Sequence, residues 1–210
     1  MKHHYVVSAN IVQQGLAVIV DPSQSTTSAS VPLRFQGMAN RQLDDKSTSD
    51  VSLLVDGAIF HVHRDVLIQR CPYFRSMFDS GMRESVENIV DLAGVQRHTV
   101  KLLLQYLYRH DVEKSLHAAS LNDLLELYKL GDLYDMECLK QLCCESSKNK
   151  IDVEQVGPFV QAAHTNGCDG LREIGSKFVV ENFRAVSQTN GFLQMSHDVL
   201  IDIVRGRDLK

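Results

Sequence analysis

Two short β-type runs separated by Asp56-Gly57 place the strongest constraint on the fold of this 210-residue chain. Val51–Val55 and Ala58–Val62 flank that dipeptide, and Asp-Gly favours a type I′ turn because both central positions of such a turn need a positive φ. The sequence therefore predicts a β-hairpin here. A third strand is expected at Asn88–Leu92, which is followed by the turn residues Ala93-Gly94.

Apolar residues at helical spacing dominate the chain after the hairpin. Pro72 supplies a preset φ for a helix start, and Ser120 with Asp123 three residues later indicates a capping box. Successive stripes then predict helices, because their members fall on one helix face. The stripes are Val100, Leu103, Leu104 and Leu107; Leu121, Leu124, Leu125 and Tyr128; and Met136, Leu139, Leu142 and Cys143.

A second, all-helical part is expected from about Ile151 onward. Asp152 and Ser196 are candidate helix N-caps, and Asn166-Gly167 is a candidate helix end. Polar, low-complexity residues between Ser23 and Ser30 favour a weakly structured leader instead. The expected organisation is a leader at 1–47, a mixed α/β domain at 48–146 and a helical extension at 147–210.

Composition and charge exclude several classes of function. The net charge of −4, with no clustered basic face, argues against nucleic-acid binding. The longest apolar run in Tyr5–Val20 is Leu16–Val20, far too short to span a membrane. We therefore expect no nucleic-acid partner, no membrane partner, and a cytoplasmic or nuclear location.

Five cysteines are present, an odd number in a chain that is neither small nor loop-rich. This count favours free, partly buried thiols in a reducing compartment over a disulfide framework. Cys143 and Cys144 are adjacent on a predicted helix, so their side chains diverge and form a poor chelating pair.

No pattern in the sequence indicates catalysis or a bound cofactor. The chain has no phosphate-binding glycine loop, no Gly-x-Ser-x-Gly turn and no His-Glu-x-x-His motif. His61 and His63 share one side of a predicted strand and supply half a zinc shell, but no second pair accompanies them. A packed histidine is the preferred interpretation of His63, so no catalytic residue, cofactor or metal is expected.

Several motifs between Asp50 and Ser85 resemble the core signature of BTB/POZ domains. Asp50-Val51 opens the first strand, and a Phe-x-x-His-Arg step begins at Phe60. The resemblance covers roughly residues 48–146 and also rests on these segments: Pro72-Tyr73-Phe74-Arg75-Ser76-Met77-Phe78, Met82-Arg83-Glu84-Ser85, Leu103-Leu104-Gln105-Tyr106-Leu107-Tyr108 and Leu130-Gly131-Asp132-Leu133-Tyr134-Asp135-Met136.

The region that follows resembles, more weakly, the 3-box and the start of the BACK domain found after the BTB domain in cullin adaptors. Asn182–Val186 and Phe192–Ser196 carry this likeness. The organisation is similar to that of speckle-type POZ proteins, without their MATH domain. The resemblance implies an α/β BTB/POZ fold, a short mixed sheet flanked by helices, followed by an all-helical extension.

The resemblance also implies two interaction surfaces. The implied dimer interface contains Leu43, Asp50 and Arg64. The implied cullin-binding surface contains Phe78, Met82, Leu121, Leu124 and Leu125. Its hydrophobic-x-acidic motif has two candidates, Leu121-Asn122-Asp123 and Leu124-Leu125-Glu126, and each of these leucines can equally belong to the buried stripe of a helix.

The function that these features favour is a homodimeric substrate adaptor for a cullin-3 type ubiquitin ligase. Such an adaptor does no chemistry and raises the local concentration of its bound substrate near the ligase. Its substrate protein is not identified by the sequence. The alternative is a dimerising scaffold or transcription-regulator module that does not bind cullin.

Overall fold

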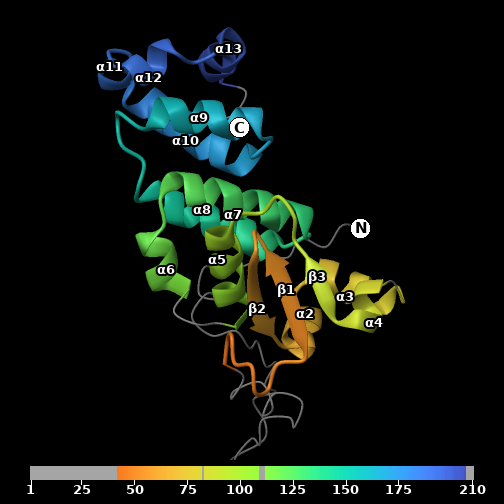
Figure 1. Cartoon of the computed structure of the whole chain (residues 1–210). Coiled ribbons are helices and arrows are strands. Elements are labelled where there is room, and N and C mark those ends of the chain that lie inside the picture. Colours follow the sequence, from red (N-terminus) through yellow and green to blue (C-terminus); the bar gives the residue numbers. More distant parts are fainter. Residues whose placement is uncertain (1–41, 82, 109–111, 207–210) are drawn as a thin grey trace, which may run out of the picture. The chain divides into compact units, whose positions relative to one another are not determined.

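A three-stranded sheet lies at one end of the first part of the chain (Figure 1). Its strands are β1 (Val51–Val55), β2 (Ala58–Val62) and β3 (Ile89–Asp91), in the order β2-β1-β3. β1 pairs antiparallel with β2 and parallel with β3. The computed structural model describes residues 42–81, 83–108 and 112–206, so most of the predicted leader, Tyr5–Val20 included, lies outside the described residues.

The hairpin turn has the conformation that its sequence predicts. Asp56 and Gly57 both have positive φ values, 46° and 73°. Along β1 the side chains alternate, so that Val51, Leu53 and Val55 are buried while the two residues between them are only half-buried. This alternation gives β1, the central strand, one fully covered face.

Helices pack against the sheet and complete the core of this part. Pro72 stands at the first turn of its helix, as predicted. The buried side chains include Leu67, Phe74 and the stripe from Val100 to Leu107. The helices are α2 (Arg64–Arg70), α3 (Pro72–Asp79), α4 (Arg83–Glu87) and α5 (Arg97–Tyr108).

Three further helices follow, and the middle one begins with the predicted capping box. The Asp123 backbone N–H donates to Ser120 Oγ, while the Asp123 carboxylate accepts from the Ser120 backbone N–H. The helices are α6 (Val112–Ala118), α7 (Leu121–Leu133) and α8 (Glu137–Lys148). α7 contacts α5, α8 and α9, so several of its faces are covered.

The helical extension contains α9 (Val156–Thr165), α10 (Asp169–Glu181), α11 (Phe183–Val186), α12 (Asn190–Leu193) and α13 (His197–Arg205). The first of these begins later than the sequence predicts. The Asp152 carboxylate accepts a hydrogen bond from the Gln155 backbone N–H at 2.8 Å, but it closes a turn rather than capping the helix. Ser196 does stand at the N-cap of α13, without a capping hydrogen bond from its side chain.

A hydrogen bond connects the extension to α7, and an ion pair joins α7 to α8 beside it. The Gly170 backbone N–H, in the first turn of α10, donates to the Tyr128 hydroxyl of α7 at 3.3 Å. Lys140 of α8 pairs with Asp132 of α7 at 2.9 Å and lies over the Tyr128 ring. In the described part of the chain, no helix has both the length and the apolar character needed to cross a bilayer.

Candidate interaction surfaces

His63, the residue before α2, is fully buried in a small polar network. Its backbone N–H donates to the Tyr108 hydroxyl at 2.7 Å, and its ring nitrogens lie 2.9 Å from that hydroxyl and 3.0 Å from Thr48 Oγ1. These contacts explain a packing role for His63. Within residues 42–81, 83–108 and 112–206, no three potential ligands are grouped so as to hold a metal ion.

Asp50 and Arg64 meet through the backbone rather than through their charged groups. The Asp50 carboxylate accepts from the Arg64 backbone N–H at 2.7 Å, which satisfies the first N–H of α2. The Arg64 guanidinium instead donates to the Phe78 carbonyl at 3.3 Å and lies 4.6 Å above the Phe78 ring. Arg64 therefore anchors α3 to the start of α2. The dimer role of Asp50, Arg64 and the half-buried Leu43 stays a prediction.

The surface expected to receive a cullin is not exposed where the sequence places it. Phe78, Leu124 and Leu125 are buried in the core, and Leu121 is half-buried. Burial of Leu124 and Leu125 agrees with the alternative that they belong to the buried stripe of a helix, because neighbouring helices cover more than one face of α7. The cullin-binding role of these residues stays a prediction. Met82 lies outside the described residues.

A groove of about 460 Å³ opens beside α7 instead. We call it the α7 groove and define it by three segments: the β3–α5 turn (Ala93–Val95), the second half of α7 (from Glu126 to Leu133) and the α9–α10 turn (Asn166–Cys168). It thus combines residues from both parts of the chain.

An exposed apolar side chain lies on this groove. Leu133 is 67% exposed, although it belongs to a helix whose other leucines are mostly buried. Leu130 and Tyr128, also on the groove, are almost covered, and burial raises the pKa of the Tyr128 hydroxyl. Tyr134, the residue after Leu133, stacks on the partly exposed Tyr73 with ring centroids 4.5 Å apart.

The charges on the groove are mutually compensated. Lys129 pairs with Glu126 at 3.2 Å, and Asp132 pairs with Lys140 at 2.9 Å. The α7 groove is therefore an apolar strip with a charged but nearly neutral border. Such a surface suits an amphipathic helix better than a small charged ligand.

Sequence reasoning missed Leu133 because it looked for the apolar stripe of α7. Leu124, Leu127 and Gly131 follow helical spacing and are buried, which is what a stripe predicts. Leu133 lies two residues past Gly131 and off that stripe. The available signal was that Leu133 is apolar although it lies outside the buried stripe of an amphipathic helix.

The cysteines are free, and most of them are covered. Cys71, Cys143 and Cys168 are buried, Cys144 is half-buried and Cys138 is exposed. Burial raises the pKa of Cys143 to about 12 and the pKa of Cys144 and Cys168 to about 11. Because nucleophilic cysteines need a lowered pKa, these side chains act as packing residues.

Comparison with known proteins gives two family matches on this chain. The model described as "BTB/POZ domain" matches residues 39–151. The model described as "BTB And C-terminal Kelch" (BACK) matches residues 158–210.

Two curated relatives cover most of the chain. The human "Kelch repeat and BTB domain-containing protein 2" is 31% identical over 163 residues, which are 77% of this chain and 25% of the relative. The Xenopus tropicalis "Kelch repeat and BTB domain-containing protein 8" is 29% identical over 195 residues, which are 90% of this chain and 31% of the relative. The chain therefore spans about a quarter to a third of the length of these relatives.

Among solved structures, the BTB domain of human Gigaxonin matches with a TM-score of 0.43 and 20% identity. The match covers 58% of this chain and 98% of that domain.

Proposed function

Because the chain belongs to the BTB/POZ domain family and continues into a BACK region, we propose that it is a non-catalytic substrate adaptor for a cullin-3 type ubiquitin ligase. The adaptor acts as a homodimer. It binds the cullin and brings a separate protein, the substrate, close to the ligase. Binding of both partners raises the effective concentration of one near the other, which requires no reaction on this chain.

The α7 groove is the surface that supports cullin binding best. An amphipathic helix needs an apolar anchor and a depression beside it, and interface energy concentrates in a few such anchors. Leu133, 67% exposed on the border of the groove, is the single observation that carries this assignment. Leu124 and Leu125 cannot serve as anchors unless the core opens.

A second segment, which does not line the α7 groove, is the candidate for the acidic motif of cullin binding. In the sequence, the hydrophobic-x-acidic pattern expected of cullin-binding members also fits Met82-Arg83-Glu84, of which Arg83 and Glu84 belong to α4. Glu84 is partly exposed, and Val86, on the same helix, is 75% exposed. We therefore assign the motif to this segment instead of to α7, where the competing leucines are buried or half-buried.

Calorimetric titration of the full chain with a cullin-3 N-terminal fragment tests the proposal. We expect binding by the unchanged chain and a loss of at least about 2 kcal/mol, roughly thirtyfold in affinity, in Leu133→Glu. Leu193→Glu is the matched control, because Leu193 is 72% exposed but belongs to α12, away from the groove residues. It should bind like the unchanged chain.

Circular dichroism must show that both variants keep their helices, since loss of fold would mimic loss of binding. If the well-folded unchanged chain does not bind, the adaptor function is wrong and a dimerising scaffold is the remaining function. If Leu133→Glu and Leu193→Glu bind equally well, the cullin surface lies elsewhere on the chain.

A further inference from the structure

The outer edge of β3 carries hydrogen-bonding groups that no described residue pairs. The Ser52 backbone N–H donates to the Asn88 carbonyl, and the Leu92 backbone N–H donates to the Leu54 carbonyl. In a parallel ladder, alternate residues face the same neighbour. Asn88, Val90 and Leu92 therefore face β1, while the N–H and C=O groups of Ile89 and Asp91 point away from the sheet.

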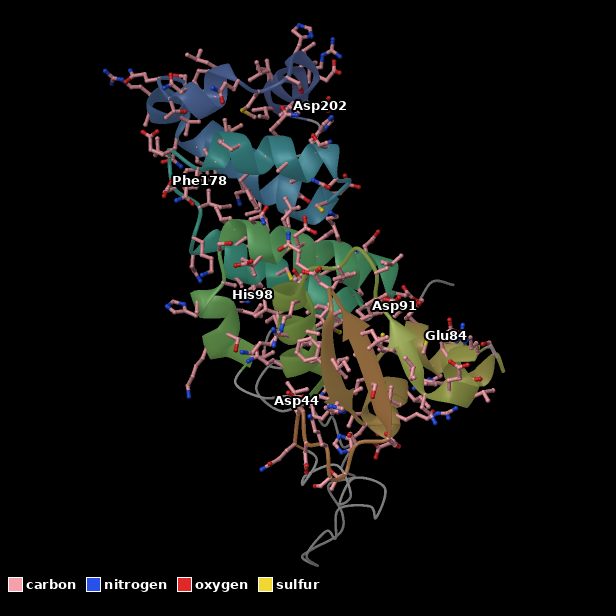
Figure 2. All side chains as sticks on the ribbon, viewed as in Figure 1. Asp44, Glu84, Asp91, His98, Phe178 and Asp202 are labelled. Carbon is pink, nitrogen blue, oxygen red and sulfur yellow. The ribbon has the colours of Figure 1, made fainter. Side chains whose placement is uncertain are left out.

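The opposite edge of the sheet, formed by β2, differs from the β3 edge because backbone groups of β2 are paired. On β2, the His61 carbonyl accepts from the Asp44 backbone N–H at 3.0 Å, and the His61 backbone N–H donates to Asp44 Oδ1 at 2.9 Å. Asp44 thus occupies the position of a neighbouring strand. Figure 2 labels Asp44 near the end of β2 and Asp91 on the β3 side of the sheet.

The β3 edge is short, only three residues, but it lacks three of the features that commonly block strand addition. These are a lysine, a proline and a bulge. The sequence from 88 to 92 is Asn-Ile-Val-Asp-Leu, with no lysine or proline. Ile89 is 44% exposed on the edge, and Val86, just before it in the chain, is 75% exposed.

The charge at this edge selects a type of occupant. Asp91 is exposed, and no ion pair to it occurs within the described residues. If β3 paired antiparallel with β3 of a second copy of this chain, Ile89 of each copy would lie opposite Asp91 of the other. An apolar side chain opposite a charged one is an unfavourable pair. A strand with an apolar residue opposite Ile89 and a basic residue opposite Asp91 is complementary instead.

We propose that the free edge of β3 binds an extended peptide by strand addition, and that the peptide carries an apolar and a basic residue two positions apart. Ile89 and Asp91 project on one face, so their partners in the added strand are two residues apart. Main-chain hydrogen bonds supply the affinity, and the two side-chain pairs supply the selectivity. The site is separate from the α7 groove and receives a strand, not a helix.

The probe is a synthetic peptide of sequence Val-Thr-Lys-Thr-Val-Thr-Lys with blocked ends, titrated into the ¹⁵N-labelled full chain. We expect the amide signals of Ile89 and Asp91 to shift and their hydrogen exchange to slow at least tenfold. The same peptide with alternate backbone nitrogens methylated should not bind, because it cannot complete the ladder. Equal binding of the methylated peptide would overturn the proposal.

Two substitutions at one position separate the backbone contribution from that of the charge. Asp91→Pro removes an outward N–H, which edge strands tolerate, and should abolish peptide binding. Asp91→Ala keeps that N–H and should weaken binding only a few fold, with less dependence on salt. If Asp91→Pro is folded and binds as well as Asp91→Ala, no strand is added. A lysine heptapeptide that binds as tightly as the probe would show mere charge attraction and would also overturn the proposal.

Discussion

The α/β part and the helical extension are built differently. A sheet and helices enclose the core of the first part, where Leu53, Leu67, Leu103 and Leu124 are completely covered. The extension consists of helices alone, and Val156, Val160 and Leu171 are completely covered there. Both parts also leave large apolar side chains exposed, such as Val86 and Leu133 in the first and Leu193 and Val204 in the second. The extension is built as layers, with α9 and α10 against α7 and α8, and shorter helices after them (Figure 1).

This difference implies an order of dependence between the two parts. The core of the α/β part is enclosed by the sheet and by helices α2–α8, although α9 also contacts α7. The extension packs one face of α9 and α10 on α7 and α8, and therefore depends on the α/β part. We expect local opening of the extension to require less free energy than global unfolding.

The largest effect is expected for Leu124→Glu. Leu124 is fully buried on α7, so the variant must either bury an unpaired carboxylate or open the core. The free energy of unfolding should fall by at least about 4 kcal/mol, in both parts together. Urea denaturation followed by circular dichroism measures it.

Leu133→Glu is the matched control, since it makes the same change on the exposed side of the same helix. It should change the unfolding free energy by no more than about 0.5 kcal/mol. If Leu124→Glu were as stable as this control, the α/β part would not have the closed core described above.

Much of the first part was predictable because its signals are local. The Asp56-Gly57 turn, Pro72 at a helix start and the Ser120–Asp123 capping box each depend on residues a few positions apart. The family motifs add their order and spacing. The prediction of a short mixed sheet followed by helices was correct for the same reason. The hydrophobic periodicity and the turn residues indicate the same elements.

The interaction surface was less predictable because exposure depends on distant packing. A helical stripe identifies which side of α7 is apolar but not how many neighbours cover it. Leu124 and Leu125 are both buried because α5, α8 and α9 all contact α7. The α7 groove joins residues 93–95 to residues 166–168, and no local pattern links two such turns.

A smaller effect, confined to the extension, is expected for Gly157→Ala. A Cβ at Gly157 would lie 2.5 Å from the Gly191 carbonyl carbon, a backbone atom that cannot move away cheaply. α9 and α12 would have to separate, at a cost of about 1–3 kcal/mol. Hydrogen exchange should become faster in α9–α13 and stay unchanged in the β1–β2 hairpin.

Gly131→Ala controls for the helix propensity of alanine. A Cβ there meets Lys140 Cγ at 3.1 Å, a side-chain atom that needs to move by only a few tenths of an ångström. The variant should be neutral or slightly stabilised, because alanine favours a helix by up to about 1 kcal/mol over glycine. For Gly157→Ala, the contradicting result would be hydrogen exchange that becomes faster to the same degree in the hairpin and in the extension. That result would show that the two parts unfold as one unit.

The smallest effect concerns alkaline pH and the buried thiols between the two parts. Burial raises the pKa of Cys168, the N-cap residue of α10, to about 11 from its usual value near 9. The folded state therefore holds its proton to a higher pH than the unfolded state does. The contribution of this raised pKa to the free energy of unfolding is fully present below pH 9. It is lost as pH rises from 9 to 11. At pH 10 the loss is about 1 kcal/mol.

Cys168→Ala removes this titration, so its unfolding free energy should fall less between pH 8 and pH 10 than that of the unchanged chain. Cys138→Ala is the control, because Cys138 is exposed on α8 and its removal should leave the pH slope unchanged. Urea denaturation under reducing conditions at each pH gives the slope for each of the three proteins. Since Cys168 borders the α7 groove, identical slopes in all three proteins would mean that the thiol is already solvated there, and that the extension is not closed over α7 at this turn.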